Sequence, residues 1–462
     1  MNPQDDVITA LATPVGEGGI AVVRISGKGA ITVADKSFRG KISLERVATH
    51  TAHFGLFFDE KEKKIDEVVA TVFRLPHSYT GEDSVEISCH GGTYIVKKII
   101  ECLIRSGARQ AEPGEFTKRA FLNGRIDLSQ AEAVADLIHA SSEYAHKLSL
   151  SQLEGRLSHK IEELREKLIE ICSLLELELD FVEEGVVLLK TEKVSDEIRH
   201  IENQIDKMIS SYESGRLSKE GIRVVIIGEP NVGKSSVFNS LIDNNRAIVT
   251  PFEGTTRDSI EESITTEGMK FNLIDTAGIR NSEDIVEIEG IKRTYKELKN
   301  SDIAILVKDC TNLNSPDLVF DNIKNLIPLD TILIKVFNKF DLVGFDQAKI
   351  SSQNKNGEEV LFSAKTGFGV KEVRNKLLDI SIMKRPSEIT NGVVLINLRH
   401  LNCLREAKLY ISSAIKAVEN KVSNEFIIFD IKAAIYSLET IIGKVTNDDI
   451  LNEIFSAFCI GK

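Results

Sequence analysis

A glycine-rich loop at residues 228–235 constrains the fold of this chain more than any other segment. It reads Gly-Glu-Pro-Asn-Val-Gly-Lys-Ser and directly follows an apolar run at residues 222–227. A strand that runs into a G-x-x-x-x-G-K-S loop and then a helix is the context in which this motif binds phosphates. Its N–H groups surround the phosphates, its lysine reaches the β- and γ-phosphates, and its serine hydroxyl binds Mg²⁺. The expected contacts are Asn231, Val232, Gly233, Lys234, Ser235 and Ser236.

Apolar runs and proline positions predict the organisation around this loop. Further short apolar runs at 271–274, 303–307, 331–337 and 360–362 alternate with amphipathic segments, which is typical of a parallel sheet with crossover helices. Proline, which helix interiors exclude, is absent between Pro113 and Pro230 and after Pro386. Apolar residues in these two stretches recur at spacings of three and four, over 157–179 and 401–415. This period predicts long amphipathic helices on both sides of the α/β region.

The simplest architecture is therefore multidomain, with an α/β domain inserted into a helical domain. Exposed loops tolerate such insertions, and a length of 462 residues suits about three domains. We expect an α+β N-terminal domain at 1–120, an all-α domain at 121–219 and 383–462, and an inserted P-loop domain of Ras-like type at 220–382.

Composition excludes several classes of protein. The chain holds 58 basic and 70 acidic side chains, a net charge of −12, which disfavours nonspecific binding to nucleic-acid phosphates but allows a local contact. No stretch approaches the roughly 18 apolar residues of a membrane span, and residues 1–14 lack the features of a signal peptide. We therefore expect a cytoplasmic protein without stable membrane insertion. Its six cysteines show no C-x-x-C spacing, so neither a disulfide framework nor a zinc cluster is indicated.

Residues 338–341 identify the base that the predicted site binds. They read Asn-Lys-Phe-Asp and follow the predicted strand at 331–337. Asp341 offers two acceptor oxygens to the N1–H and exocyclic amine of guanine, a pair of donors that adenine lacks. Ser363, Ala364 and Lys365 follow the next strand and are expected to close over the base.

Two further motifs complete the prediction of GTP binding. In Asp275-Thr276-Ala277-Gly278 the aspartate can hold the Mg²⁺ shell and the last N–H can meet the γ-phosphate; in Gly254-Thr255-Thr256-Arg257, Thr256 can bind Mg²⁺. The remaining expected contacts with GTP are Thr250, Pro251, Phe252, Glu253, Gly254, Thr255, Thr276 and Ala277.

The residue after the D-x-x-G is Ile279, where Ras-like enzymes have the glutamine that positions water. Glu287 is a candidate for this task; the alternative is that residues 283–289 form a solvated acidic face. Asn231 could brace the phosphate loop, or it could join the carbonyls of Thr250 and Phe252 around a monovalent cation. Such a cation supplies the charge that an arginine finger supplies elsewhere.

Segments outside these motifs resemble the tRNA modification GTPases of the MnmE/TrmE family. They are Tyr79-Thr80-Gly81-Glu82-Asp83, Cys89-His90-Gly91-Gly92, Pro113-Gly114-Glu115-Phe116, Arg119-Ala120-Phe121-Leu122-Asn123-Gly124 and the terminal Cys459-Ile460-Gly461-Lys462. The resemblance covers essentially the whole chain. It implies an N-terminal domain that binds tetrahydrofolate and dimerises.

The resemblance also implies an activity. Members of this family are homodimers that form a heterotetramer with a flavin-dependent partner protein. Driven by GTP hydrolysis, they add a carboxymethylaminomethyl or related aminomethyl group to C5 of the wobble uridine, position 34, in the anticodon of certain tRNAs. A 5-formyl- or 5,10-methylene-tetrahydrofolate supplies the one-carbon unit.

Site residues follow from the resemblance. K⁺ is expected at Asn231, Thr250, Phe252 and Thr255, where it supports pairing of the GTPase domains, and Mg²⁺ at Ser235 and Thr256. Glu287 orients water, Lys234 acts on the phosphates, and Cys459 is a functional thiol near the folate. The expected folate contacts are Arg24, Glu86, Arg125 and Lys462. Arginines suit the carboxylates of folate and a carboxylate suits its pterin edge; relatives often carry lysine where this chain has Arg125.

Two other functions share some of these motifs. A GTP-switch RNA-binding protein of the ribosome-assembly type gives no reason for the folate-like N-terminal segments or the terminal thiol motif. A one-carbon transferase regulated by GTP predicts small-molecule products without tRNA. Cys89 and His90 are adjacent, not at ligand spacing, and are expected to be structural.

Overall fold

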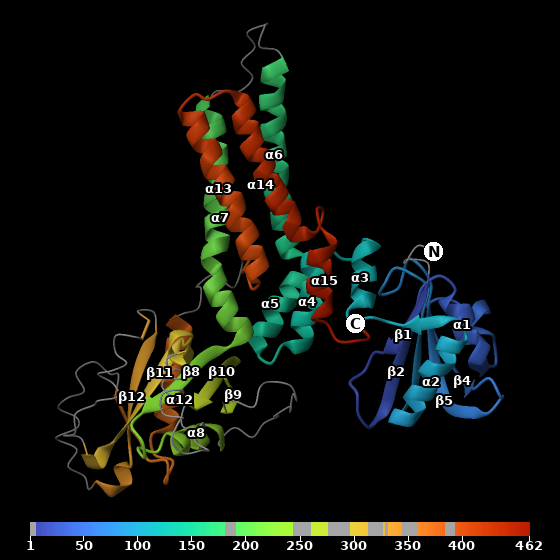
Figure 1. Ribbon diagram of the computed structural model, residues 1–462, viewed down its shortest axis with the longest axis horizontal. Helices are drawn as coiled ribbons and strands as arrows, with labels where there is room; N and C mark the ends of the chain where they lie inside the picture. The colour runs from blue at the N-terminus through green and yellow to red at the C-terminus, as the bar shows by residue number, and fades with distance from the viewer. Residues whose placement is uncertain are drawn as a thin grey trace, which may run out of the picture. The chain divides into compact units, whose positions relative to one another are not determined.

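The computed structural model describes residues 6–180, 191–243, 260–275, 296–312, 327–328, 331–343, 359–383 and 393–462. The chain forms two compact units (Figure 1). The first contains Met1–Ile138, Leu150–Ile205 and Asn402–Lys462, and the second contains His139–Ser149 and Asp206–Leu401. An α/β region thus interrupts a helical region, as the sequence predicts.

The first unit begins with a seven-stranded sheet in the order β3-β4-β5-β6-β2-β1-β7. Its strands are β1 (Val7–Leu11), β2 (Gly18–Ser26), β3 (Phe38–Gly40), β4 (Thr51–Phe58), β5 (Lys64–Phe73), β6 (Ser84–Gly91) and β7 (Ala108–Gln110). Neighbouring strands are antiparallel except β1 and β7. Helices α1 (Ala30–Ser37) and α2 (Thr93–Arg105) share one core with the strands.

Alternation along β2 and β6 decides which side chains face away from this core. Val23 and Ile25 on β2, and Val85 and Ile87 on β6, are buried in it. Successive side chains of a strand point to opposite faces. The residues between them, Arg24 and Glu86, therefore lie on the other face of the sheet, and they are direct partners in the antiparallel register.

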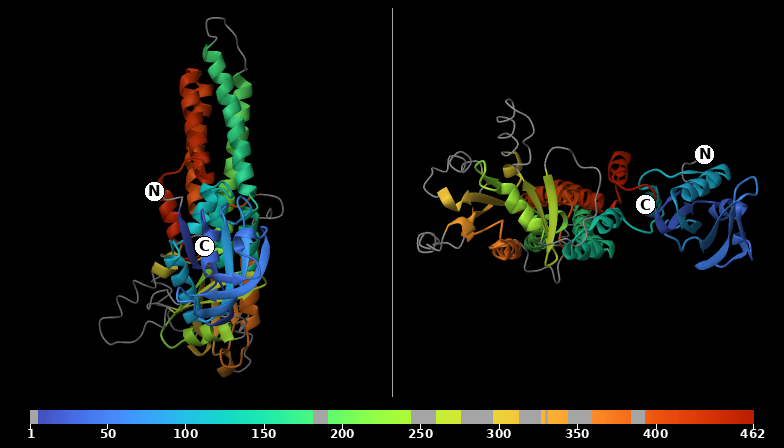
Figure 2. Two further views of the ribbon diagram at one scale, coloured as in Figure 1. Left: turned by 90° about the vertical axis from the view of Figure 1, so that its right-hand side faces the viewer. Right: turned by 90° about the horizontal axis from the view of Figure 1, so that it is seen from below.

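Long helices follow the sheet. They are α6 (Arg156–Asp180), α7 (Thr191–Glu220), α13 (Leu398–Glu419) and α14 (Asn424–Ile442), which run side by side in Figures 1 and 2. The second unit contains α7 from Asp206 and α13 up to Leu401. The predicted apolar stripe of α6 is buried from Leu157 to Leu175. Arg165 of α6 pairs with Glu439 of α14 at 2.5 Å, and Ser412 of α13 bonds to Glu202 of α7. The sequence prediction of long amphipathic helices is confirmed.

Shorter helices join the long helices to the sheet. They are α3 (Glu115–Leu122), α4 (Leu128–His139) and α15 (Asp448–Ser456). Helix α5 (Glu143–Leu153) begins in the second unit, which contains its residues up to Ser149. Asp127 caps α4, because its carboxylate accepts from the N–H of Gln130 while the Gln130 side chain accepts from the N–H of Asp127. Leu128, Leu451 and Phe455 share a core, which joins α4 to the C-terminal helix α15.

The second unit contains a six-stranded sheet in the order β13-β12-β11-β8-β10-β9. Its strands are β8 (Ile222–Gly228), β9 (Ile260–Thr266), β10 (Met269–Asp275), β11 (Ile303–Asp309), β12 (Ile332–Asn338) and β13 (Glu359–Leu361). The five predicted strands are present and their pairings are parallel. Strand β9, which no apolar run predicts, pairs antiparallel to β10 at the edge of the sheet. Its only apolar residues are Ile260 and Ile264, because one face of an edge strand can remain polar.

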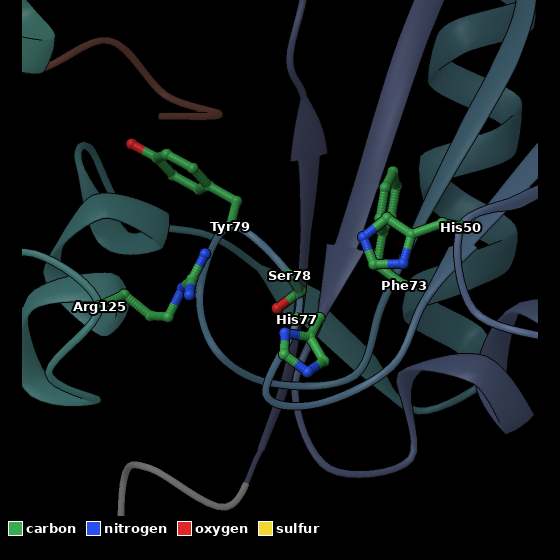
Figure 3. Close-up of a pocket in the computed structure, with 6 residues that line it drawn as sticks. All are labelled: His50, Phe73, His77, Ser78, Tyr79 and Arg125. Atoms are coloured by element: carbon green, nitrogen blue, oxygen red, sulfur yellow. The ribbon is translucent and has the colours of Figure 1, made fainter.

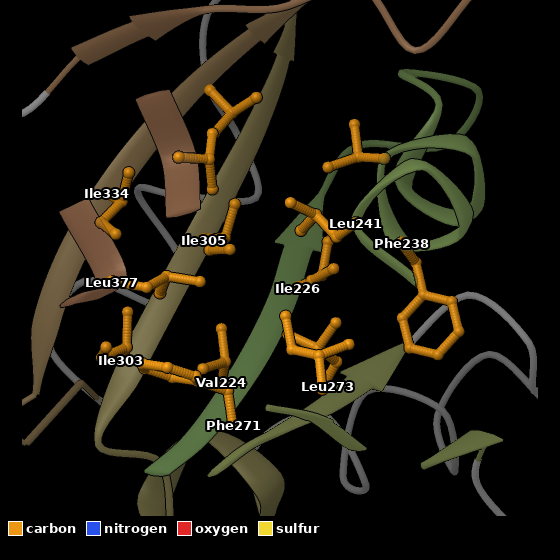
Figure 4. Close-up of a cluster of buried hydrophobic side chains, with 14 of the residues drawn as sticks. Val224, Ile226, Phe238, Leu241, Phe271, Leu273, Ile303, Ile305, Ile334 and Leu377 are labelled. Carbon is orange, nitrogen blue, oxygen red and sulfur yellow. The ribbon is translucent and has the colours of Figure 1, made fainter. Parts of the chain in front are cut away.

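Both faces of this sheet are covered. Val224 and Ile226 of β8 pack with Phe238 of α8 (Lys234–Asp243) and Leu377 of α12 (Val370–Met383) in the core shown in Figure 4. The alternate residues Val225 and Ile227 belong to a second core on the other face. Because β8 and β10–β13 are parallel, their carboxyl ends meet at one edge of the sheet. The predicted phosphate and base motifs follow those ends.

Candidate functional site

The phosphate loop runs from β8 into α8 and needs glycine at position 233. Gly233 has φ +92°, and a Cβ there would lie 2.4 Å from Nδ2 of Asn338. Helix α8 begins at Lys234, so the first N–H groups of the helix and the exposed Ser235 and Ser236 lie at the end of the loop. Helix N-termini attract phosphates. Lys234 Nζ donates to the carbonyls of Gly228 and Glu229 at 3.0 and 2.8 Å.

Asn338, at the end of β12, connects three of the predicted nucleotide segments. Its buried side chain donates from Nδ2 to the Val232 carbonyl at 3.0 Å, and its Oδ1 accepts from the N–H of Ala364 at 3.2 Å. Asp341, in the 3-10 turn Phe340–Leu342, accepts from the Ser363 hydroxyl at 2.6 Å. The phosphate loop, the base motif and the 363–365 segment are thus brought together, although they are distant in sequence.

One member of this cluster, Asp309, belongs to none of the sequence motifs. Asp309 is the last residue of β11 and lies opposite Asn338 of β12. It forms an ion pair with Lys339 at 2.6 Å. Lys339 Nζ also donates to the Asn231 carbonyl at 2.9 Å. Burial is the largest single influence on the pKa of Asp309 and raises it, but hydrogen bonds from Lys339 and Thr311 outweigh burial and the pKa is lowered. The sequence feature that could have indicated Asp309 is its position at the end of a predicted strand, at the sheet edge where the other nucleotide motifs lie.

Several predicted residues lie outside the described residues. They are Thr250, Pro251, Phe252, Glu253, Gly254, Thr255, Thr256, Thr276, Ala277, Gly278 and Glu287. Asp275 is described and is buried at the end of β10. Asn231 is exposed within the phosphate loop at φ +64°.

A second cluster of predicted residues centres on Arg24 in the N-terminal sheet. Its Nε and Nη2 donate to Oε1 of Glu86 at 3.0 and 2.8 Å. The guanidinium lies over the rings of Tyr79 and Phe116, 5.0 and 5.6 Å from their centroids, in cation–π contact. Nη1 is buried and has no hydrogen-bond partner. Because a buried unpaired donor is costly, this atom points to an acceptor supplied by a ligand.

The C-terminus joins this cluster. Ile460 forms a bridge with Pro113, and the N–H of Phe116 donates to the Lys462 carbonyl at 3.2 Å. Burial lowers the pKa of Lys462, the nearby charge of Arg24 lowers it further, and Glu86 and Cys459 oppose this to a lesser extent. Lys462 therefore lies close to the Arg24–Glu86 pair. Cys459 is exposed in the same segment.

A network of ion pairs, which no sequence motif predicts, fixes the loop between β5 and β6. Arg119, only 5% exposed, pairs with Asp6, Glu82 and Glu115 at 2.5, 3.2 and 3.0 Å. Glu82 also accepts from the Ser26 hydroxyl at 2.9 Å. Three of the segments that carry the family resemblance therefore meet in one buried network, which fixes the loop that presents Tyr79.

Arg125 stands apart from the Arg24–Glu86 pair but shares Tyr79 with it. Both Arg125 and Tyr79 line a cavity of about 310 Å³, shown in Figure 3. The Tyr79 hydroxyl hydrogen-bonds with Thr117 at 2.8 Å, and burial raises the pKa of this phenol. The structure thus gathers Arg24, Glu86 and Lys462, and places Arg125 in a cavity that shares Tyr79 with this cluster.

The docking of the C-terminus allows a direct test at Gly461. Its φ is +98°, and a Cβ would lie 2.0 Å from the Leu11 carbonyl, so we expect Gly461→Ala to detach the terminal segment. The measurement is hydrogen exchange at the Phe116 amide, which bonds to Lys462. The control is Gly124→Ala, where φ is +68° but nothing lies within 4 Å of the added Cβ; it costs about 1 kcal/mol from its backbone conformation alone. Unchanged protection of Phe116 in Gly461→Ala contradicts the assignment.

No helix in the described part of the chain is long and apolar enough to cross a membrane. Among the described residues, His90 bonds to Asp66 through its N–H and Nδ1, and Cys89 is buried.

The sheet order, the loop after β8 and the base motif after β12 together define a P-loop protein that binds guanine nucleotides. Family models described as "MnmE helical domain" and "GTP-binding protein TrmE N-terminus" match residues 128–459 and 7–125. The chain belongs to the MnmE/TrmE family of tRNA modification GTPases, which confirms the resemblance.

Relatives and a solved structure accompany these matches. A "tRNA modification GTPase MnmE" of Flavobacterium johnsoniae is 44% identical over 467 residues and covers 99% of both chains. Another, of Carboxydothermus hydrogenoformans, is 43% identical over 466 residues, covering 99% of this chain and 100% of that protein. The solved structure of Aquifex aeolicus Era bound to GDP.AlF4- is 25% identical with a TM-score of 0.29, over 41% of this chain and 66% of that chain.

Proposed function

We propose that this protein hydrolyses GTP to drive modification of tRNA at the wobble uridine. With a flavin-dependent partner protein, it adds a carboxymethylaminomethyl or related aminomethyl group to C5 of uridine 34. A 5-formyl- or 5,10-methylene-tetrahydrofolate supplies the one-carbon unit, and the chain acts as a cytoplasmic homodimer that contacts the tRNA anticodon. We infer domains at 1–120, 121–219 with 383–462, and 220–382.

The observation that carries this proposal is a second site in the same chain as the guanine-nucleotide site. The Arg24–Glu86 pair, with the buried unpaired Nη1 and the nearby Lys462, forms a polar cluster on the face of the N-terminal sheet opposite its core. A GTP switch that only binds RNA gives no reason for this cluster. The clustering therefore favours the folate-dependent enzyme over the ribosome-assembly alternative.

The described residues of the phosphate loop fit a GTP–Mg²⁺ complex. Ser235 is exposed in the first turn of α8, where its hydroxyl is available to Mg²⁺, with Thr256 as the proposed second protein ligand. We propose that Lys234 contacts the phosphates, that Asp341 binds guanine between Asn338, Lys339 and the 363–365 segment, and that Glu287 orients water.

We also propose K⁺ at Asn231, Thr250, Phe252 and Thr255, where it supports pairing of two GTPase domains. The exposure of Asn231 in the left-handed region of the phosphate loop supports this role. GTP hydrolysis is then faster in KCl than in NaCl at equal ionic strength. Equal rates of GTP hydrolysis in the two salts contradict the proposed K⁺ site.

The Arg24 cluster and Arg125 together fit the two ends of a folate. The carboxylate of Glu86 can accept hydrogen bonds from the pterin amino-pyrimidinone edge, the neighbouring Arg24 and Lys462 can donate to acceptors of the same end, and Arg125 suits a carboxylate. The unpaired Nη1 of Arg24 is a donor that only an added acceptor satisfies. Cys459, exposed next to this cluster, is proposed as a functional thiol.

The experiment that tests the whole proposal is mass spectrometry of tRNA from cells that lack this protein. We expect the C5 group to be lost from wobble uridines and restored by the intact gene. Unchanged wobble uridines in the deletion strain reject the proposed function, and a defect limited to ribosome assembly supports the alternative.

Arg24→Gln tests the folate site separately. We expect the affinity for 5-formyltetrahydrofolate to fall by about tenfold or more, because a hydrogen-bonded charge contributes about 1.5–3 kcal/mol. Calorimetric titration of the full chain measures this, with thermal unfolding as a check on the fold. The control is Arg39→Gln, which changes an arginine that is 47% exposed in its pair with Glu62. Equal affinity in the two variants counts against folate contact at Arg24.

A further inference from the structure

The cavity beside Tyr79 has lining residues that the proposed function leaves mostly unused. It measures about 310 Å³ and is lined by His50, Phe73, His77, Ser78, Tyr79 and Arg125 (Figure 3). Only Arg125 among them has a proposed role. The others come from the residue before β4, the end of β5 and the loop between β5 and β6.

Figure 3 shows how these side chains surround the cavity. Arg125 and Tyr79 lie on one side, His50 and Phe73 on the other, and His77 and Ser78 lie between them. The imidazole of His50 packs edge-on against Phe73, with ring centroids 5.3 Å apart. Its Nδ1 hydrogen-bonds with the Thr49 hydroxyl at 2.9 Å, so its Nε2 is the ring atom that can face a ligand.

The lining residues favour an anionic ligand. They include two imidazoles, one guanidinium and two hydroxyls, and none of them is an aspartate or glutamate. Within the described part of the chain, no carboxylate lies within ion-pair distance of Arg125. A guanidinium forms charge-assisted hydrogen bonds with carboxylates, and an imidazole N–H also donates to them. A carboxylate-bearing ligand therefore meets complementary groups from three directions.

Tyr79 connects this cavity to the Arg24–Glu86 pair. Its ring lines the cavity and also lies 5.0 Å from the Arg24 guanidinium. A volume of about 310 Å³ is at the lower end of the range for pockets that hold a small molecule, about 300–1,000 Å³. The cavity thus suits one end of a ligand whose other end lies at Glu86.

We propose that the cavity binds the acidic γ-glutamyl tail of a polyglutamylated folate, with His50, His77 and Arg125 as carboxylate partners. This inference rests on the proposed folate site and specifies which form of the ligand the site prefers. Tyr79 borders both the Arg24–Glu86 pair and the cavity, so a pterin at Glu86 and a tail in the cavity would both lie next to it. Each additional γ-linked glutamate adds one carboxylate, and the cavity offers a guanidinium and two imidazoles as hydrogen-bond donors to these carboxylates.

The test compares two ligands on the full-length chain by calorimetric titration. 5-Formyltetrahydrofolate with three γ-linked glutamates is expected to bind about tenfold more tightly than the form with one glutamate. In a variant with both His50→Gln and His77→Gln, the ratio of the two affinities falls to near one. Both histidines are exposed, so the fold is expected to persist, and thermal unfolding checks this.

The control is His53→Gln, which changes a histidine of β4 that does not line the cavity, and it retains the preference for the longer tail. Equal affinity of both ligands for the unaltered chain overturns the tail site but leaves the folate site standing. A ratio that survives in the double variant also overturns the assignment. If neither ligand binds, the proposed folate function itself fails.

Discussion

Lys234→Ala is expected to slow GTP hydrolysis at saturating GTP by about 100-fold or more. The lysine lies at the start of α8 within the phosphate loop, where its Nζ reaches the loop carbonyls at 2.8 and 3.0 Å and can turn to the phosphates. A donor placed where charge develops in the transition state contributes about 100- to 1,000-fold to the rate. Phosphate release in the steady state measures the rate, and mass spectrometry of tRNA from cells carrying the variant measures the modification.

The control for this variant is Lys299→Ala. Lys299 is an exposed lysine that precedes β11, so it lies at the opposite edge of the sheet from the ends that carry the nucleotide loops. The Lys299→Ala variant should hydrolyse GTP at the rate of the unaltered protein. If cells with Lys234→Ala modify wobble uridine fully, GTP hydrolysis has no part in the reaction.

Asp341→Asn is expected to change the base that the site prefers from guanine to xanthine. The carboxylate accepts from both the N1–H and the exocyclic amine of guanine, and its loss weakens GTP binding by about 100-fold. An asparagine amide can instead donate to the C2 carbonyl of xanthine while its oxygen accepts from N1–H. The bond that Asp341 accepts from Ser363 can persist, because the amide keeps an oxygen. Affinities for GTP and xanthosine triphosphate, measured with fluorescent analogues, give the ratio.

Asp379→Asn serves as the matched change, since Asp379 is exposed on α12 and is no part of the base motif. It should keep the preference for GTP. A preference for GTP over xanthosine triphosphate that survives in Asp341→Asn shows that another residue recognises guanine.

The nucleotide site could be predicted largely from short motifs. Residues 228–235 and 338–341 are contiguous segments whose function depends on local backbone geometry, and the apolar runs before them are strands in the structure. Asp309 escaped prediction because it belongs to no motif; its contact with Lys339 depends on two neighbouring strands that end together.

The folate cluster depended more on tertiary structure. Arg24 and Glu86 were expected only from the resemblance, and their pairing needs the antiparallel register of β2 and β6. Arg119 could not be assigned a role, because its partners Asp6, Glu82 and Glu115 come from separate segments. The cavity lined by His50 and His77 has no sequence signature at all.

The sequence by itself determined the nucleotide motifs, the long amphipathic helices and the insertion of one domain into another. These features depend on residues that are neighbours along the chain, and on periods of two or 3.6 residues. The tertiary structure alone decided that Lys462 lies near the Arg24–Glu86 pair, that one arginine holds three family segments, and that a cavity lined by Arg125 and two histidines includes Tyr79. Such contacts arise when distant apolar faces pack into one core, which places polar side chains together that no local pattern links.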